Sequence, residues 1–517
     1  MSRQNAISLL FACLSRLQRA PIAIALVTLC LVACSLGPRY KRPQIAPPAA
    51  WRVDSTATPA ESAAEGPAPA SAPGNAPAAP QAADVGSAEA WPSADWWRGF
   101  GSSQLDDLIA QAQKANDDVA AAIARVRQAD AQAQIAGAPL LPTLAASGDA
   151  SRQRQKPSGA PVGTAPTTFS QFSALASASY ELDFWGKNRA TLNAAKLAAT
   201  ASRYDRATVD LTVMTSVAST YFQAIEVHDR LNVAERDLST AQTILKDLKL
   251  EEQVGTAAAL DVAQQETTVA VLNASIPPLR QQLRQTLDAL AVLIGKMPQE
   301  LEPPGGTLSD LSEPQVGPGL PSALLARRPD VAAAEAQLMS ANANIAAARA
   351  SIFPSIDLTA DGGFVSTALA SLITPVNQVF ALSGAVTQEI FAGGALVGNY
   401  RFAKGRYAEL LADYHKSVIS AFSNVEDALV AAQQTAEQYR RQQEAVAKAR
   451  RAYEITEIQL HAGTVNVLAV LNTQSALFSA EDALVQVRFA HLQALVQLFG
   501  ALGGGWEQGV PSSSGTG

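Results

Sequence analysis

The stretch that decides the fold is Phe172–Gly186, FSALASASYELDFWG. From Phe172 to Phe184 every second residue is apolar, and the residues between are serine, glutamate or aspartate, apart from Leu175. This period of two indicates a β-strand with one apolar and one polar face. Its apolar face lacks the valine and isoleucine of a globular core, so it suits a strand between lipid and water. From Lys187 to about Leu250 the pattern is helical and contains no proline, which predicts a long helix directly after the strand.

The same join occurs twice. In the second half, residues 382–390 alternate in the same way and lead through Phe391–Gly394 into another long helical stretch. Each joining strand has a shorter predicted partner upstream, over residues 144–151 and 355–364. Matched residues recur at a nearly constant separation: Asp118-Val119 with Asp330-Val331, Pro142 with Pro354, and Gly255-Thr256 with Gly463-Thr464. We interpret this as an internal duplication of strand, loop, strand, long helix, turn and long helix.

The composition excludes several classes of protein. Charged residues make up 16% and aromatic residues 6% of the chain, which favours closely packed helices over a thick globular core. The net charge of −7 argues against nucleic acid as a partner. All three cysteines lie in the first 34 residues, so no disulfide framework is expected, and the four histidines lack metal-ligand spacing. No catalytic constellation and no phosphate-binding loop was found, so we expect neither a cofactor, a metal site nor an enzyme.

Residues 1–33 have the features of a secretory signal peptide. Arginines precede a short apolar core that is too short to span a bilayer. The core ends in Leu31-Val32-Ala33-Cys34, which resembles the lipobox of bacterial lipoproteins and would place a lipid on Cys34. A chance cysteine after an ordinary signal peptide is the alternative. Ser35 follows instead of aspartate, which by the same resemblance directs the protein to the outer membrane. No later run of 18 apolar residues predicts a membrane-spanning helix.

The remaining boundaries follow from composition and the repeat. Residues 34–90 are rich in proline and alanine and are expected to form a lipid-anchored tether. The first repeat covers 91–300 and begins with a predicted helix over about 103–137. A surface connector covers 301–326, the second repeat covers 327–506, and residues 507–517 form a tail that is expected to be disordered.

Four membrane strands cannot close a barrel, and an open sheet edge in lipid would leave backbone groups without hydrogen bonds. Identical chains around a cyclic axis solve this, with two copies giving eight strands and three giving twelve. An eight-stranded barrel is filled by its own side chains, whereas a larger one encloses water. Because the polar strand face suits a water-filled lumen, three copies are favoured.

The chain resembles the TolC-type outer-membrane efflux factors, specifically their lipidated, NodT-like branch. The resemblance rests on the order and spacing of several motifs: Gly37-Pro38, Tyr40 and Pro43, Trp96-Trp97, Tyr180–Phe184 with Gly186, Ala326–Asp330, Phe353-Pro354, Glu389–Gly394, Glu426–Leu429, Gly463-Thr464 with Val470-Leu471, and Ala501–Trp506. It implies a homotrimer with a 12-strand outer-membrane β-barrel that continues into an α-helical coiled-coil tunnel through the periplasm. It also implies a periplasmic membrane-fusion adaptor and an inner-membrane pump, of the RND type, as partners.

The expected function is therefore the outer-membrane channel of a tripartite efflux pump for drugs or other toxic small molecules. Two alternatives stay open. One is the exit duct of a type I protein secretion system, which uses the same architecture. The other is a lipid-anchored coiled-coil scaffold without a pore, against which the four alternating strands count.

The resemblance also assigns candidate sites at the turns between the long helices. The expected adaptor-docking residues are Gly255, Thr256, Leu260, Gly463, Thr464 and Leu468. Alternatively, the two leucines only close each hairpin.

A periplasmic gate is implied just past the second turn. In the family, acidic rings lie there, and the matching positions in this chain are Ala469 and Asn472. Leu460 occupies a position at which tyrosine is common in the family, three residues before Gly463. In the first hairpin, Asp261 provides a carboxylate six residues past Gly255. This predicts a gate that carries less negative charge than is usual in the family and that multivalent cations block only weakly. The alternative is that Ala469 and Asn472 only pack the helices.

Overall fold

The computed structural model describes residues 38, 40–48, 51–52, 91–156, 165–314, 316–317 and 321–506. The signal peptide, Cys34, most of the expected tether and the C-terminal tail lie outside the described residues. The chain divides into two compact units. The strand unit comprises the described parts of Met1–Pro43, Val126–Ala201 and Ala334–Tyr414, and the hairpin unit comprises those of Gln44–Arg125, Ser202–Ala333 and His415–Gly517.

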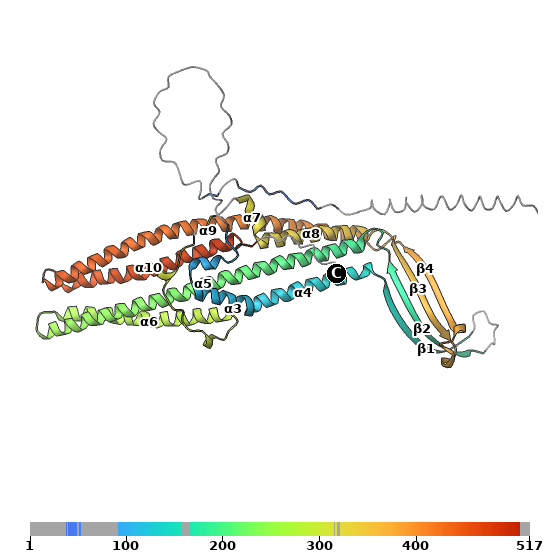
Figure 1. Ribbon diagram of the computed structural model, residues 1–517, viewed down its shortest axis with the longest axis horizontal. Coiled ribbons are helices and arrows are strands. Elements are labelled where there is room, and N and C mark those ends of the chain that lie inside the picture. The colour runs from blue at the N-terminus through green and yellow to red at the C-terminus, as the bar shows by residue number, and fades with distance from the viewer. Residues whose placement is uncertain are drawn as a thin grey trace, which may run out of the picture. The chain divides into compact units, whose positions relative to one another are not determined.

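The strand unit contains one antiparallel sheet in the order β1-β2-β3-β4 (Figure 1). The strands are β1 (Thr143–Gln155), β2 (Thr167–Glu181), β3 (Ser355–Ser366) and β4 (Gln378–Thr387). All four differ from the prediction at one end or both. Strand β1 continues four residues past Ser151, β3 continues two residues past Phe364, and β4 begins four residues before Leu382. Strand β2 begins five residues earlier than expected and ends at Glu181 instead of Gly186, and β4 ends at Thr387, before Ile390. The two strand pairs that the alternation predicted are present, one in each half of the chain.

The helices repeat in length as well as in order. Four long helices form two hairpins, α5 (Lys187–Gln253) with α6 (Ala259–Leu293) and α9 (Ala395–His461) with α10 (Val467–Ala501). The two outgoing helices have 67 residues each and the two returning helices 35 each. At 1.5 Å per residue, each outgoing helix is about 100 Å long, and it continues without interruption from its first to its last residue.

The shorter helices precede the strand pairs, connect the two halves or, in the case of η6 and η7, lie between β3 and β4. They are η2 (Trp96–Phe100), α3 (Ser103–Ala115), α4 (Asp117–Gly137), η3 (Ala138–Leu140), η4 (Pro298–Glu300), η5 (Leu308–Asp310), α7 (Pro321–Arg327), α8 (Pro329–Ala350), η6 (Leu369–Ser371) and η7 (Pro375–Asn377).

The prediction of a single helix over 103–137 is wrong, because the helix is interrupted at Asn116. The backbone of Asn116 is extended, with ψ of 128°. Its Oδ1 accepts hydrogen bonds from the backbone N–H groups of Asp118 (2.9 Å) and Val119 (3.1 Å), while its Nδ2 donates to the carbonyl of Leu293 (2.8 Å). Asparagine is a favoured N-cap, so this side chain ends α3 and starts α4.

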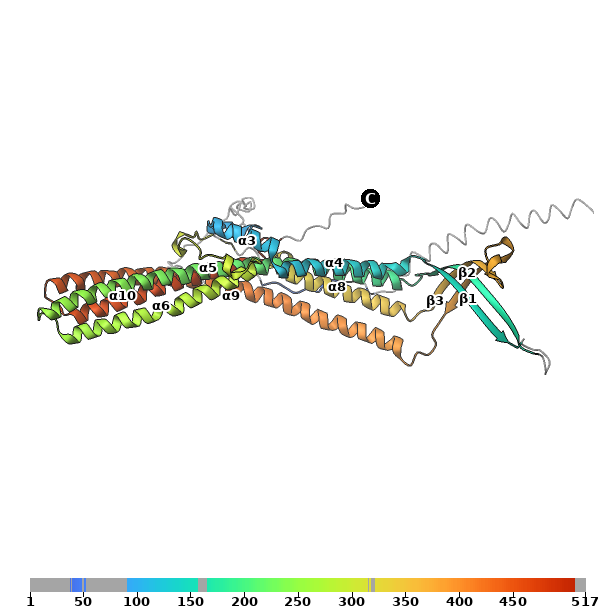
Figure 2. The ribbon, with the colours of Figure 1, turned by 90° about the horizontal axis from the view of Figure 1, so that it is seen from below.

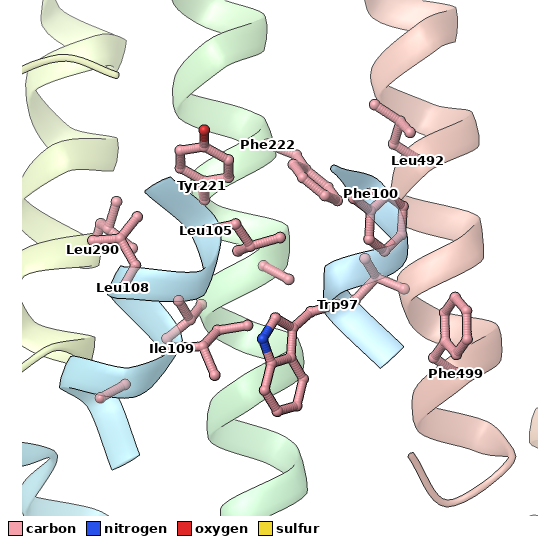
Figure 3. Close-up of a cluster of buried hydrophobic side chains, with 14 of the residues drawn as sticks. Trp97, Phe100, Leu105, Leu108, Ile109, Tyr221, Phe222, Leu290, Leu492 and Phe499 are labelled. Carbon is pink, nitrogen blue, oxygen red and sulfur yellow. The ribbon is translucent and has the colours of Figure 1, made fainter. Parts of the chain in front are cut away.

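The core of the hairpin unit is an aromatic and aliphatic cluster that joins both hairpins (Figure 3). Trp96 stacks on Phe499 of α10, with ring centroids 4.9 Å apart, and Phe100 meets Phe222 of α5 edge to face. Further members come from α3, α5, α6 and α10: Leu105, Leu108, Ile109, Tyr221, Leu290 and Leu492. Trp96 and Trp97 are thus packing anchors that fix the N-terminal segment to the hairpins.

The prediction of a surface connector at 301–326 is wrong for its middle part. Leu308 is 2% exposed and Leu311 is 7% exposed, and both belong to the same core cluster. The backbone N–H of Leu308 donates to Oδ2 of Asp229 (2.8 Å), and Nη2 of Arg488 donates to the carbonyl of Leu311 (2.8 Å). These hydrogen bonds satisfy backbone groups in a segment that pairs with no strand. A proline- and glycine-rich segment can therefore be buried here.

Part of the expected tether is held against the folded chain. Within the strand unit, the guanidinium of Arg42 pairs with the carboxylate of Glu335 at 2.8 Å. Within the hairpin unit, Trp51 is 1% exposed and packs against Phe422, with ring centroids 6.1 Å apart. The described residues between 38 and 52 therefore form a strap and do not behave as the free tether predicted over 34–90.

Candidate functional site

The sheet has two faces of opposite character. Because side chains alternate along a strand and the ladder keeps all four strands in register, even-numbered residues share one face and odd-numbered residues the other. The even face is apolar: Leu144, Ala146, Ala150, Phe172, Ala174, Ala178, Tyr180, Ile356, Leu358, Phe364, Phe380, Leu382 and Val386. The odd face is rich in hydroxyls and carboxylates: Ser147, Asp149, Ser151, Ser173, Ser177, Ser179, Glu181, Asp357, Thr359, Asp361, Ser383 and Thr387.

The apolar face has no cover within the described chain. Phe380 is 84% exposed and Leu382 81% exposed, far more than a soluble sheet leaves open to water. On the polar face, hydroxyls bond across strands, as between Thr143 and Ser179 (2.6 Å). One face therefore suits lipid and the other a water-filled lumen.

The two outer strands have free edges. Strands β1 and β4 lie at opposite ends of the sheet and each pairs with only one neighbour among the described residues. In lipid, such edges would leave rows of backbone N–H and C=O groups without partners. The sheet of one chain is therefore an incomplete membrane structure.

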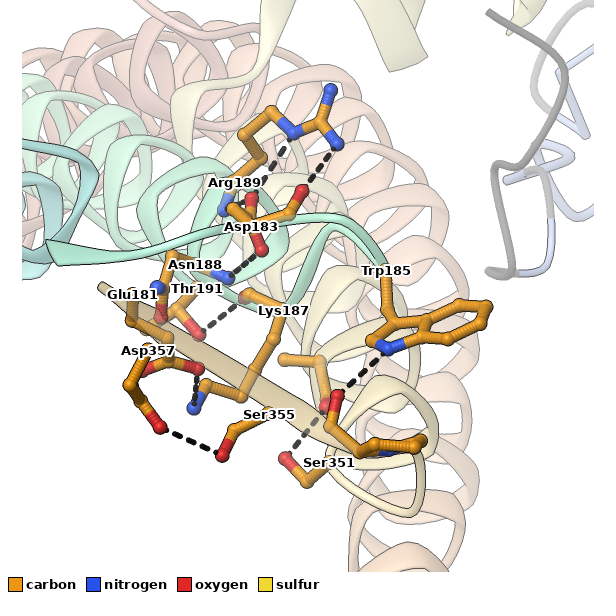
Figure 4. A network of polar contacts seen from close by, with 12 residues as sticks. Glu181, Asp183, Trp185, Lys187, Asn188, Arg189, Thr191, Ser351, Ser355 and Asp357 are labelled. Atoms are coloured by element: carbon orange, nitrogen blue, oxygen red, sulfur yellow. Dashed lines mark hydrogen bonds and ion pairs between the residues drawn. The ribbon is translucent and has the colours of Figure 1, made fainter. Parts of the chain in front are cut away.

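A polar network ends β2 and starts α5 (Figure 4). The carboxylate of Asp183 accepts hydrogen bonds from the backbone N–H groups of Asn188 and Arg189, both at 2.9 Å, and from Nε of Arg189 at 3.0 Å. An anion at a helix N-terminus satisfies unpaired amides and is favoured by the helix dipole. Lys187 adds an ion pair with Glu181 at 2.6 Å, so strand end and helix start are tied directly together.

The first join also contacts the turn between α8 and β3 within the strand unit. Nε1 of Trp185 donates to the carbonyl of Pro354 at 2.8 Å, and the Trp185 ring stacks on Phe353 at 4.8 Å (Figure 4). In the second join, by contrast, Ile390 and Phe391 are 97% and 90% exposed. Tryptophan and phenylalanine at this level of the sheet suit the border between lipid and water.

The two long hairpins turn in the same way. Gly255 and Gly463 have φ of 81° and 70°, which glycine adopts without strain. The hydroxyls of the following threonines, Thr256 and Thr464, donate to carbonyls five residues earlier, at 3.0 and 3.1 Å. The two turns lie at the same end of the hairpin unit (Figure 2), where an apolar cluster joins the hairpins: Leu248, Val262, Val467 and Leu471.

This cluster closes the hairpins, and the two candidate docking leucines do not take part in it. Leu260 is 66% exposed and Leu468 is 44% exposed. The turns therefore present apolar side chains on the surface, a feature typical of a contact site.

The gate positions surround the same turns. Oδ2 of Asp261 accepts a hydrogen bond from the backbone N–H of Ala258 at 3.3 Å, so this carboxylate caps α6. Leu460 packs against the apolar cluster, Ala469 is half-buried and Asn472 is exposed. Asp261 therefore has a structural role as a helix cap, and Leu460 has one in packing. The side chain of Asn472 is exposed on α10.

Sequence reasoning missed a charged cluster between α5 and α10. Nε of Arg230 donates to Asp482 at 2.7 Å, across 252 residues of sequence. Glu481 receives two guanidinium groups, from Arg236 at 3.2 Å and Arg450 at 2.6 Å. Only the i,i+4 pair of Glu226 with Arg230 carried a sequence signal.

One member of this cluster has a strongly shifted pKa. Asp237 is 5% exposed, and its burial, followed by the negative charge of Glu481, raises its pKa from 3.8 to about 7. Because this carboxyl group is buried, we expect the packing of α5 to depend on pH.

The family model described as "Outer membrane efflux protein" matches residues 108–296 and 320–504. The chain belongs to the outer membrane efflux protein family. The two matched segments correspond to its two strand-and-hairpin halves, which confirms the internal duplication.

Known relatives agree with this assignment. The chain is 40% identical over 427 residues to a Pseudomonas aeruginosa protein named "Pyoverdine export outer membrane protein OpmQ", covering 82% of this chain and 90% of the relative. It is 31% identical over 488 residues to the "Probable efflux pump outer membrane protein TtgC" of Pseudomonas putida, covering 94% and 95%. The structure of the open state of the Neisseria gonorrhoeae MtrE outer membrane channel matches with a TM-score of 0.77 and 28% identity, over 91% of this chain and 98% of that one.

The predictions of an outer-membrane location, an efflux function and a barrel-and-tunnel fold are confirmed for this efflux protein. Its assignment to the lipidated, NodT-like branch stays a prediction, since Cys34 lies outside the described residues. Among the residues that the structure describes, no helix is both long enough and apolar enough to cross a membrane.

Proposed function

We propose that three copies of this efflux protein form one outer-membrane channel, which receives small molecules from an inner-membrane pump through a periplasmic adaptor. The observation that carries the proposal is the open four-stranded sheet, apolar on one face and polar on the other, with free edges at β1 and β4. Pairing β1 of one copy with β4 of the next gives every edge a partner.

Three copies are the stoichiometry that leaves a passage. Two copies would give eight strands, whose interior side chains fill the barrel. Three give twelve strands, an even number within the range of known membrane barrels, with Asp149, Asp357 and Asp361 on the water-facing side.

Trimer and pore are tested together. The purified full-length protein should migrate as a heat-modifiable trimer in mild detergent and should open discrete conductance steps in a planar bilayer. A monomer without conductance would support the scaffold alternative and would refute the channel.

The hairpin turns are the proposed adaptor site. In a trimer, the two turns of each chain give six similar sites, each presenting one exposed leucine, Leu260 or Leu468. The double variant Leu260→Ser/Leu468→Ser should abolish export of the cargo into the medium while trimer levels stay normal, because neither side chain supports the fold. Val271→Ser, on helix α6 like Leu260 and 64% exposed, is the matched control. Unchanged export by the double variant would move the docking site elsewhere.

The proposed gate uses the positions just past the turns. Three-fold symmetry would place three copies of Asn472 around one aperture, where charges are poorly screened. Asn472→Asp should therefore strengthen block by multivalent cations and raise cation selectivity in a planar bilayer, whereas Asp261→Asn should weaken them. If neither substitution changes either quantity, Ala469 and Asn472 only pack the helices.

The N-terminal lipid is proposed on Cys34. Cys34→Ala should abolish metabolic labelling with palmitate. Labelling that persists in the variant would overturn the assignment.

The proposed cargo is a secreted siderophore of the pyoverdine type. Two relatives named for pyoverdine export are 38% and 40% identical to the chain, against 31% for a relative named for toluene efflux. Deleting the gene should lower siderophore in the medium and raise it in the periplasm. A deletion that leaves siderophore secretion intact and sensitises cells to solvents or antibiotics would favour toxic-compound efflux instead.

A further inference from the structure

The β1–β2 hairpin is longer than the β3–β4 hairpin beside it (Figure 1). The last residue pair between β2 and β3 is Phe172 with Ser366, and Phe172 lies opposite Ala150 in β1. The β1–β2 ladder continues for five more pairs, to Gln155 opposite Thr167. This extension lies at the end of the sheet where the strands turn, opposite the end where they join the helices.

Two arginines in this extension are on the lipid-facing side. Arg152 and Arg154 are even-numbered residues of β1, so they continue the apolar face that begins with Leu144, while Gln153 and Gln155 take the other face. Both arginines are exposed, as is Lys156 directly after the strand. Within the described part of the chain, none of the three forms an ion pair.

The residues opposite these arginines are small and polar. Arg152 pairs with Ser170, and Arg154 pairs with Thr168. The apolar face of the sheet thus ends in a patch of guanidinium and hydroxyl groups, which we call the basic rim: Arg152, Arg154, Lys156, Thr168 and Ser170.

Strand geometry places the basic rim near one border of the lipid-facing apolar band, where the headgroups begin. From Leu144 to Arg152 the strand rises about 27 Å, at 3.4 Å per residue, and from Leu144 to Arg154 about 34 Å. A tilt of about 40° reduces these to heights of about 21 and 26 Å, against an apolar band about 25 Å tall. Arginine on the lipid face is costly at mid-membrane and nearly free at its border, so the rim marks the outer border.

We propose that the basic rim binds the phosphate groups of a phosphorylated glycolipid of the outer leaflet, of the lipid A type. A guanidinium fork matches a phosphate with two parallel, charge-assisted hydrogen bonds, and the opposing hydroxyls supply further donors. An anionic cargo in the lumen would instead meet the odd face, which carries Asp149 and Asp361. The side on which the arginines lie therefore selects lipid as the occupant.

The proposal rests on the barrel proposed above, so its test keeps the two apart. The test uses the full-length trimer in detergent, titrated with mixed micelles that contain diphosphorylated lipid A. Lipid bound to the trimer is counted by native mass spectrometry. Heat-modifiable migration and single-channel conductance of each preparation report on the barrel independently.

The decisive variant moves the charges without removing them. The face swap Arg152→Gln/Gln153→Arg/Arg154→Gln/Gln155→Arg keeps composition and net charge and places both guanidinium groups on the lumen face. At roughly 1 kcal/mol per basic residue near a membrane surface, losing two should weaken lipid A binding about 30-fold. The plain removal Arg152→Gln/Arg154→Gln should have the same effect. The matched control Lys114→Gln/Lys448→Gln removes two exposed helix charges and should bind like the wild type.

Two further probes identify the ligand. Dephosphorylated lipid A should bind the wild type about as weakly as diphosphorylated lipid A binds the face swap. Inorganic phosphate at millimolar concentration should not displace the lipid, because a free ion lacks the acyl chains that contact the apolar face. If trimers conduct normally and the face swap binds lipid A as tightly as the wild type, or if dephosphorylated lipid binds equally well, the basic rim is not a phosphate site. Displacement by inorganic phosphate alone would likewise overturn the lipid assignment.

Discussion

Replacing Asp237 by asparagine tests whether α5 is sensitive to pH. Burial and the negative charge of Glu481 raise the pKa of Asp237 from 3.8 to about 7. Between these values the folded chain holds a proton that the unfolded chain releases, so this group's contribution to stability is present below pH 4 and is lost as the pH rises towards 7. Raising this pKa from 3.8 to about 7 corresponds to at most about 4 kcal/mol, at about 1.4 kcal/mol for each tenfold change in the ionisation equilibrium.

Asparagine has the same shape and no charge to titrate. Asp237→Asn should therefore match the wild type near pH 4 and should be more stable, by up to about 4 kcal/mol, at pH 8. The assay is hydrogen exchange of peptides covering residues 226–245 of the trimer, corrected for the intrinsic pH dependence of exchange, at pH 5, 6, 7 and 8. The control Asp247→Asn changes an exposed carboxylate of the same helix. Equal protection of Asp237→Asn and wild type at pH 8 would refute the reasoning.

Three further substitutions test packing. Trp51→Ala should weaken the packing of the strap by about 3–5 kcal/mol, so that trypsin cleaves after Arg52 much faster. An unchanged cleavage rate would contradict the buried position of this ring. Gln474→Leu removes two buried amide atoms that have no hydrogen-bond partner among the described residues. It should slow hydrogen exchange around the hairpin turn at least tenfold, and faster exchange would mean that the amide is satisfied in solution. Gly505→Ala puts a Cβ 2.3 Å from backbone atoms and strains a φ of 75°, so it should lower the midpoint of thermal unfolding. Gly398→Ala in α9, where a Cβ would meet no described atom within 4 Å, should leave the midpoint unchanged. Equal midpoints for the two variants would show that the loop around Gly505 relaxes without cost.

The strands and long helices could be predicted from sequence because each depends on a local period. The alternation around Phe172 and the uninterrupted helical pattern after Lys187 needed no knowledge of tertiary contacts. Element ends were less predictable, since single side chains decide them. Asp183 takes the first amides of α5 and so ends β2 early, and Asn116 divides one expected helix into two.

The missed features depend on partners far away in the sequence. Arg230 finds Asp482 only when the two hairpins pack. Leu308 lies in a segment of loop-like composition and is buried because the core of the hairpin unit accepts it. The strap carried one signal that was not used: Trp51 is a large aromatic residue within a proline- and alanine-rich stretch.

The strap has a practical consequence for protein engineering. The backbone N–H of Arg52 donates to Oε1 of Glu426 at 2.9 Å, and the guanidinium of Arg327 lies 4.9 Å from the centre of the Trp91 ring, all within the hairpin unit. The stretch 53–90 therefore starts and ends on the same compact body, and its length does not set any distance across the molecule. The entropy cost of a connection between two fixed ends grows only with the logarithm of its length, so doubling that length costs about 0.6 kcal/mol. An affinity tag or a small reporter domain inserted there should leave the channel assembled.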